Sequence, residues 1–220
     1  MTKVKICGIK TLKDARAAIE AGADYLGFNF YPRSVRFIER QACAEITSVL
    51  KKEHPHVNLV GVFVNSSFTA VQDILNACSL HLAQLHGDET PEVVASFHGK
   101  AYKAIRRSTD SETDSRTITD FVRTRRGVGP ALLVDAAVKG LYGGSGVTAD
   151  WNGAAELAKQ YPLLLAGGLT PENVADAIRQ VRPWGVDVAS GVESAPGEKD
   201  SGKMKAFVKA ILELRESESA

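Results

Sequence analysis

The chain of 220 residues is 44% hydrophobic and 24% charged, which is ordinary for a globular protein long enough to bury a sizeable core. Its formal net charge of +1 at pH 7 gives no reason to expect nucleic acid or an anionic membrane as a partner. No apolar run is long enough to span a bilayer and the first residues lack the apolar core of a signal peptide, so we expect a cytoplasmic, soluble protein.

Short apolar, β-branched runs alternate with segments of helical periodicity along the whole chain. The first helical segment has Leu12, Ala15 and Ile19 on one face. Thr11 before it and Gly22 after it are typical helix caps. The last helical segment runs from Met204 to Leu214, and we expect the polar end at 216–220 to fray. The expected strands are Val4–Cys7, Tyr25–Phe30, Leu59–Val64, Leu82–Leu85, Tyr102–Ile105, Leu132–Asp135, Leu163–Ala166 and Val186–Ala189.

Eight strands, each followed by a helix, require parallel pairing, because crossover helices join parallel strands. We therefore predict that residues 1–220 form a single domain of the α/β class, a (β/α)8 TIM barrel. A doubly wound open sheet could also hold eight strands. It would place a nucleotide site after the first strand, and "CGIKTLKDA" has no GxGxxG there.

Polar residues and glycines stand at the carboxyl ends of the expected strands, where barrels of this class carry their function. No single member is specific, but together they predict one ring around the barrel mouth. The set is Cys7, Asn29, Asn65, Gln84, His86, Arg106, Asp135, Gly167, Gly168, Ser190 and Gly191.

Two neighbouring loops predict a phosphate site. In "LLLAGGLTPENV" a buried strand runs into Gly167–Gly168, with Thr170 as the expected N-cap of the next helix. A tight turn alone would also explain these glycines. The next strand ends in Ser190–Gly191, however, and the loops after strands seven and eight often hold phosphate in such barrels.

Other candidates have plain structural alternatives. Asp135 ends an apolar run, where a carboxylate is costly to ionise; this suits a general acid, while a helix N-cap or salt-bridge partner is the alternative. Arg33 and Arg36 could clamp a carboxylate, although at least one should be a solvated loop arginine. The glycine-rich "LYGGSGVTADW" (141–151) is either a loop over the substrate or a plain connector.

The three cysteines, Cys7, Cys43 and Cys78, are odd in number and far apart. Their spacing fits neither a zinc site nor a CxxC motif, so we expect reduced thiols. Cys43 and Cys78 fall in helical patterns and are expected in the core. Cys7 taken alone is more often a core residue than a catalytic one.

The pieces in this order resemble the phosphoribosylanthranilate isomerase family of tryptophan biosynthesis. The matching segments are "KICGIK", "GADYLGFNFYPRSVR", "VGVFVN", "AQLHGDE", "LLVDA", "YGGSGVTADW", "LLLAGGLTPENV" and "GVDVASGVESAPGEKD". The resemblance implies a barrel enzyme with no cofactor and no metal. It implies an aldose–ketose isomerase that converts N-(5-phosphoribosyl)anthranilate to 1-(2-carboxyphenylamino)-1-deoxyribulose 5-phosphate by an Amadori rearrangement.

The resemblance also implies residue roles. Cys7 is then the general base and Asp135 the general acid. Only a thiolate is useful as a base, so nearby positive charge or N–H dipoles should lower the pKa of Cys7. The implied substrate-binding residues are Arg36, Gln84, His86 and Asp187, and the implied phosphate-binding residues are Gly167, Gly168, Ser190 and Gly191. The partner is a small phosphosugar–anthranilate substrate, and the chain is a monomer or a homodimer.

The sequence departs from the family pattern in two loops. Val35 stands where the family often has proline, which puts the rigidity of the Arg36 loop in doubt. Ser145 replaces the usual threonine of a Gly-Thr-Gly loop, and Ala149 replaces a phenylalanine. The loss of the aromatic residue at 149 could loosen the packing of that loop.

Two alternative functions remain. A related sugar-phosphate isomerase of histidine synthesis would use an aspartate in place of the first-strand cysteine, so Cys7 argues against it. A non-catalytic phospholigand-binding barrel would not need Cys7, Asp135 and Arg36 together, and it would bind without turnover.

Overall fold

A computed structural model of the chain describes residues 2–106, 115–123, 129–135 and 151–219. The glycine-rich segment at 141–150 and most of the polar stretch at 108–117 lie outside these residues, so the expectations for them stay predictions.

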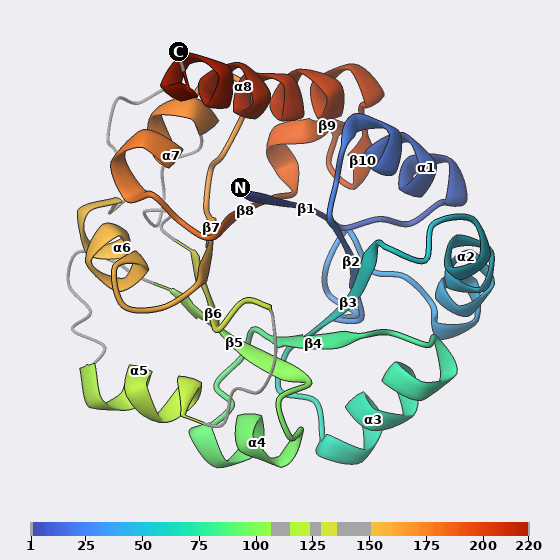
Figure 1. Ribbon diagram of the computed structural model, residues 1–220. Coiled ribbons are helices and arrows are strands. Elements are labelled where there is room, and N and C mark those ends of the chain that lie inside the picture. The colour runs from blue at the N-terminus through green and yellow to red at the C-terminus, as the bar shows by residue number, and fades with distance from the viewer. Residues whose placement is uncertain (1, 107–114, 124–128, 136–150, 220) are drawn as a thin grey trace.

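The eight strands pair in parallel in the order β1 to β8, and β1 closes the barrel by pairing with β8 (Figure 1). This closure confirms the (β/α)8 barrel and excludes an open doubly wound sheet. All eight expected strands are present, with ends that differ by at most one residue. The strands are β1 (Lys3–Cys7), β2 (Tyr25–Asn29), β3 (Asn58–Phe63), β4 (Leu82–Leu85), β5 (Ala101–Arg106), β6 (Leu132–Asp135), β7 (Leu163–Ala166) and β8 (Gly185–Val188).

The helices form an outer ring around the strands (Figure 1). They are α1 (Leu12–Ala21), α2 (Arg40–Glu53), α3 (Phe68–Ala77), α4 (Pro91–Ser96), α5 (Ser115–Val122), α6 (Trp151–Ala158), α7 (Val174–Val181) and α8 (Ser201–Ser219). Within the described ranges, no helix combines the length and the apolar character needed to cross a membrane. Helix α8 continues to Ser219, past the expected end at Leu214, and the expected fraying at 216–220 stays a prediction. Good helix formers such as glutamate extend a helix that its buried residues have already nucleated.

The helix caps follow the sequence at α1 and differ from it at α7. Thr11 Oγ1 accepts a hydrogen bond from the Asp14 N–H at 3.0 Å, and Gly22 ends α1 with a left-handed φ of 110°. The prediction of Thr170 as the N-cap of α7 is wrong, because the cap is Asn173. The Thr170 N–H donates to Asn173 Oδ1 at 2.8 Å, which closes a separate turn before the helix begins.

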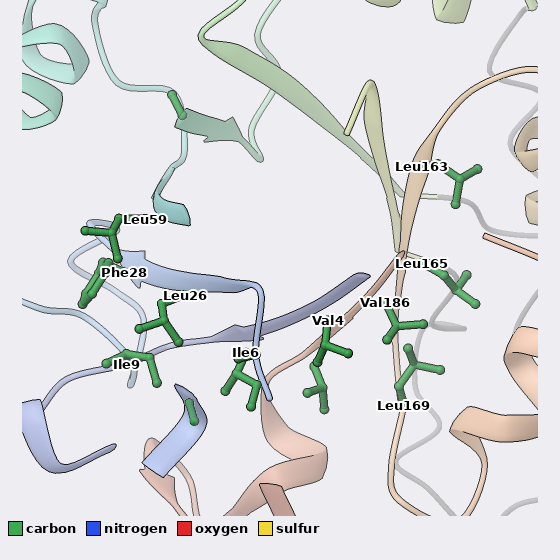
Figure 2. Packing of buried hydrophobic residues seen from close by; sticks show 14 of the residues in the cluster. Val4, Ile6, Ile9, Leu26, Phe28, Leu59, Leu163, Leu165, Leu169 and Val186 are labelled. Carbon is green, nitrogen blue, oxygen red and sulfur yellow. The ribbon is translucent and has the colours of Figure 1, made fainter. Parts of the chain in front are cut away.

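Alternation along each strand divides the core into two parts. Side chains such as Val4, Ile6, Leu26 and Val186 belong to the larger cluster between the strands and the helices (Figure 2). The other face of the strands points into the barrel. Apolar side chains on this face form a smaller cluster of Tyr25, Val60, Tyr102, Ala104, Leu133, Leu164 and Ala166. The polar residues at the strand ends lie on this inward face.

A short antiparallel hairpin between β8 and α8 was not expected from the sequence. A 3-10 turn, η1 (Ser190–Val192), leads into β9 (Glu193–Ala195), which pairs with β10 (Glu198–Lys199). The three- and two-residue strands are too short for a periodic pattern to reveal them.

Candidate active site

Two adjoining cavities lie at the carboxyl ends of the strands. The first, of about 320 Å³, brings together nine of the ten predicted site residues: Cys7, Arg36, Gln84, His86, Asp135, Gly167, Gly168, Asp187 and Ser190. The second, of about 560 Å³, shares Asn29, Val62 and His86 with the first and is also lined by Asn65 and Arg106. Every predicted member of the ring of strand ends except Gly191 lines at least one of these two cavities.

Cys7 ends β1 and lines the first cavity, with its residue 8% exposed. Gly27 on the neighbouring strand makes room for the thiol, since a Cβ there would lie 2.6 Å from Cys7 Sγ. Burial raises the pKa of the Cys7 thiol, while the positive charges of Lys5 and Lys199 act in the opposite direction. The prediction of a lowered pKa is therefore wrong: the positive charge is present, but the loss of hydration outweighs it.

Lys5 lies on the inward face of β1, two residues before Cys7, and its side chain has no exposed surface. Its ammonium donates to Asp187 Oδ1 at 2.7 Å and to Gln84 Oε1 at 2.9 Å. Burial by itself lowers the pKa of Lys5, but the charges of Asp187, Cys7 and Tyr102 prevail and raise it. Lys5 therefore remains a cation beneath the thiol.

Gln84 connects this cation to His86. Its Oε1 accepts from both Lys5 and the Tyr102 hydroxyl, the latter at 3.0 Å, so its Nε2 faces His86 Nδ1 at 3.1 Å. The amide nitrogen can only donate, which makes Nδ1 the acceptor and leaves the proton of a neutral imidazole on Nε2. Burial lowers the pKa of His86, with Asp135 opposing, so the ring is neutral at pH 7.

Asp135 ends β6 on the same inward face. The carboxyl Oδ2 lies 4.0 Å from His86 Nε2, the ring atom that carries the proton. Although the three residues before it are buried, the Asp135 side chain keeps 27% exposure and lines the cavity. The Asp135 carboxyl group therefore faces the cavity.

The two arginines of the loop after β2 differ, as the sequence suggested. Arg33 is exposed to solvent, whereas Arg36 lines the cavity. Arg36 is bound through two hydrogen bonds to Glu193, with Nε donating to Oε1 and Nη2 to Oε2, both at 2.7 Å. Its guanidinium is thereby fixed beside the cavity rather than free in solution.

The two predicted phosphate loops lie side by side. Gly167 and Gly168 both have left-handed φ values, 97° and 66°, which a side chain would strain. Ser190 lines the same cavity. Gly191 does not; it packs against the backbone of Leu169, with which a Cβ at residue 191 would overlap. Gly191 thus holds the two loops together.

Sequence reasoning missed Lys5, Glu193 and Lys199, all of which are buried charged groups in or behind the site. Lys5 could have been found, because it shares the inward face of its strand with Cys7. Glu193 and Lys199 lie on the hairpin that no pattern predicted.

Among the described residues, no group of three or more His, Cys, Asp or Glu side chains is arranged to hold a metal ion. The cavity offers instead a thiol, a carboxyl, an imidazole, an arginine and two glycine- or serine-bearing loops. This set can transfer protons and bind anionic groups.

Comparison with known proteins gives a consistent result. The model of the family described as N-(5′-phosphoribosyl)anthranilate (PRA) isomerase matches residues 4–210. An N-(5′-phosphoribosyl)anthranilate isomerase of Magnetococcus marinus is 46% identical over 211 residues, covering 95% of this chain and 94% of that protein.

Solved structures agree with the sequence match. The chain resembles a phosphoribosyl anthranilate isomerase of Thermotoga maritima with a TM-score of 0.83 and 39% identity, covering 97% of this chain and 100% of the other. A phosphoribosyl anthranilate isomerase in complex with reduced 1-(o-carboxyphenylamino)-1-deoxyribulose 5-phosphate matches with a TM-score of 0.81 and 36% identity, with the same coverage.

Proposed function

Because the chain belongs to the N-(5′-phosphoribosyl)anthranilate isomerase family, it is an isomerase of tryptophan biosynthesis, and we propose that Cys7 and Asp135 carry out its proton transfers. The reaction is an Amadori rearrangement, in which an aminated aldose becomes an aminoketose. It opens the ribose ring, moves a proton from the second carbon, and needs one group that gives a proton and one that takes a proton.

Asp135 gives the first proton. Protonation of the ribose ring oxygen breaks its bond to the first carbon, and the anthranilate nitrogen supplies the electron pair that forms the Schiff base. The carboxyl lines the cavity at the end of β6, and the neutral His86 ring presents its Nε2–H toward Asp135 Oδ2.

Cys7 takes the second proton. The Schiff base makes the hydrogen on the second carbon acidic, and the thiolate removes it to give an enolamine that rearranges to the ketone. Because burial raises the pKa of Cys7, only a small fraction of the thiol is ionised, but that thiolate is a strong base. Lys5 beneath it stabilises the thiolate. The sulfur lies on β1 and the carboxyl on β6, so the two groups can act on different atoms of one substrate.

The remaining site residues hold the substrate. Arg36 binds the anthranilate carboxylate, and backbone N–H groups of the Gly167–Gly168 and Ser190–Gly191 loops bind the phosphate. Asp187, fixed by Lys5, accepts from a ribose hydroxyl. Gln84 and His86 complete the wall of the site, although the polar atoms of Gln84 are occupied by Lys5, Tyr102 and His86. Gln84 therefore acts on the substrate through His86.

The ligand is a small phosphosugar joined to a carboxylated aromatic ring, and the chain works as a monomer or a homodimer in the cytoplasm. The three cysteines are all free thiols, which supports a reducing compartment. Sedimentation equilibrium distinguishes the two oligomeric states.

One observation supports the proposal most strongly: Cys7, Asp135, Arg36 and the two loops line a single cavity. The test is turnover of N-(5′-phosphoribosyl)anthranilate by the purified chain, followed as loss of the substrate's fluorescence. Wild-type turnover that Cys7→Ala and Asp135→Asn each abolish, with unchanged circular dichroism, supports the assignment. Near-normal turnover by either variant overturns that residue's role.

A further inference from the structure

Glu193 is a buried carboxylate that no step of the reaction uses. Its side chain is 4% exposed, yet four hydrogen bonds converge on it. Arg36 donates from Nε and Nη2, both at 2.7 Å, Lys199 Nζ donates to Oε1 at 2.8 Å, and the Gly197 N–H donates to Oε2 at 3.1 Å. Burial works to raise the pKa of Glu193, but these donors prevail and lower it, so the group is a carboxylate at neutral pH.

The pairing with Glu193 determines which part of Arg36 a ligand can use. A guanidinium presents five N–H bonds in a planar fork. Glu193 occupies the edge formed by Nε and Nη2, and the N–H bonds of Nη1 with the second one of Nη2 form the other edge. Because Arg36 lines the cavity with Cys7, that second edge is the one available to a bound carboxylate.

The stem of Arg36 is fixed as well. A Cβ at Gly8 would lie 2.6 Å from Arg36 Cδ, so the arginine crosses directly over a glycine. Gly8 also has a left-handed φ of 83°. The stem of the arginine therefore packs on Gly8, directly after β1, and its head is bound by Glu193 of β9.

Lys199 makes the net charge of the Arg36–Glu193–Lys199 cluster positive, which favours the binding of an anion. Arg36 and Lys199 carry two positive charges and Glu193 one negative charge, which leaves a charge of +1 on the three residues. Without Lys199, the negative charge of Glu193 would cancel the positive charge of Arg36. Lys199 also donates to the Ala189 carbonyl at 2.9 Å, directly before Ser190, so the hairpin joins the Arg36 site to the phosphate loop.

We propose that Glu193 is a positioning residue that aligns Arg36 for the carboxylate of the substrate's aromatic ring, with Lys199 supplying the compensating charge. The proposal rests on the function proposed above, in which Arg36 binds this carboxylate. It makes Glu193 and Lys199 determinants of specificity, although neither touches the substrate. Loss of Glu193 should therefore affect ligands that bear the carboxylate and spare those that lack it.

The experiment compares two ligands by calorimetry: reduced 1-(o-carboxyphenylamino)-1-deoxyribulose 5-phosphate, and the same compound without its carboxylate. For wild type, the ratio of the two dissociation constants measures the preference for the carboxylate. Glu193→Gln should lower that preference about tenfold or more, since hydrogen bonds between charged groups depend on alignment. In turnover, KM should rise more than kcat falls.

Glu53→Gln is the matched control. Glu53 also accepts two hydrogen bonds from an arginine, Arg16, at 3.0 and 2.7 Å, but this pair lies on the exposed surface of α1 and α2. It should leave the preference unchanged. Should Glu193→Gln fail to fold, Lys199→Met serves as the second variant, because it removes the compensating charge and should also lower the preference.

Two results would overturn the inference. One is a preference that survives in Glu193→Gln; the other is an equal loss of affinity for both ligands, which would mark a purely structural role. The variant Arg36→Met distinguishes a failure of this inference from a failure of the proposed function. If Arg36→Met loses the preference while Glu193→Gln keeps it, the inference alone fails. If Arg36→Met keeps the preference, Arg36 does not bind the carboxylate, and both assignments fail.

Discussion

Lys5 lies two residues before Cys7 on the inward face of β1, so the thiol stands above a fully buried ammonium group. The two groups affect each other in opposite ways. Lys5 lowers the pKa of Cys7 against the larger effect of burial, and Cys7 helps to raise the pKa of Lys5.

The reaction rate should depend on the ionisation of Cys7. Because burial raises the pKa of Cys7, only a minor fraction is thiolate at pH 7. The rate at which iodoacetamide alkylates Cys7 should therefore rise with pH until it passes the raised pKa of the folded thiol. Cys7→Ser should lower kcat by roughly 10²- to 10⁴-fold, the usual contribution of a general base. An alkylation rate that is flat above pH 7 would contradict the raised pKa, and near-normal turnover in Cys7→Ser would contradict the catalytic role of Cys7.

Replacing Lys5 by methionine should shift that profile. Without the ammonium, burial acts on Cys7 unopposed from this side, so the thiol pKa moves further up and the alkylation profile moves with it. Asp187 would lose its partner at 2.7 Å, and we expect a loss of stability of about 3 to 5 kcal/mol. Alkylation of the folded variant by iodoacetamide as a function of pH measures the thiol directly. An unchanged titration would show that Lys5 does not act on Cys7.

Asp135→Asn tests the acid separately from the fold. The amide keeps the size of the carboxyl but cannot supply its proton, so kcat should fall roughly 10²- to 10⁴-fold. The side chain is 27% exposed, and the melting temperature should change little. Binding of the reduced product analogue should remain, since this ligand is past the ring-opening step. Loss of both binding and stability would instead assign Asp135 a structural role.

Gly191→Ala should weaken phosphate binding more than catalysis. A Cβ at this position overlaps the Leu169 backbone, so the loops after β7 and β8 must separate. We expect the affinity for inorganic phosphate to fall and KM to rise, with kcat less affected. Gly129→Ala is the control, because the nearest atom to its Cβ is 3.9 Å away. Equal effects of the two substitutions would mean that the loop contact is unimportant.

Glu193 should make the stability of the protein depend on acid pH. Its pKa is lowered from an ordinary value near 4.5 in the folded chain, so its contribution is fully present above that value. The contribution is lost as the pH falls through the lower pKa of the folded state. Glu193→Gln should thus be less stable than wild type by about 3 kcal/mol at pH 7, and the difference should shrink below pH 4.5 in urea denaturation.

Much of the architecture follows from local sequence pattern. Every strand is a short apolar run beside a helical segment, and the strand ends could be placed within one residue because polar or glycine residues stop each run. Closure does not follow from the number of units, because an open doubly wound sheet could also hold eight strands; the absence of GxGxxG after the first strand favoured the barrel. The cap of α7 could not be predicted, because Thr170 and Asn173 are both good caps and a hydrogen bond between them decides the outcome.

Most residues of the site could be predicted from the sequence, whereas the electrostatic effects on them were harder to predict. A strand-end position is sufficient to place Cys7, Asp135 and Ser190 at one mouth. The balance of burial against charge at Cys7 depends on how deeply β1 is covered and on Lys199, which reaches the site from a hairpin. Arg36 is recognisable from its loop, but its partner Glu193 is 157 residues away and carries no local signal.

The pair of Lys5 and Asp187 also bears on the order of folding. The two residues are 182 positions apart, on the first and the last strand of the barrel. During synthesis, the ammonium of Lys5 must stay hydrated until β8 has left the ribosome and can dock against β1. A chain that ends before Asp187 lacks the carboxylate that pairs with this cation. Such a chain cannot bury β1 without also burying the charge of Lys5 unpaired. The barrel therefore closes in the same step that completes the floor of the active site, and this step comes only after β8 has been synthesised.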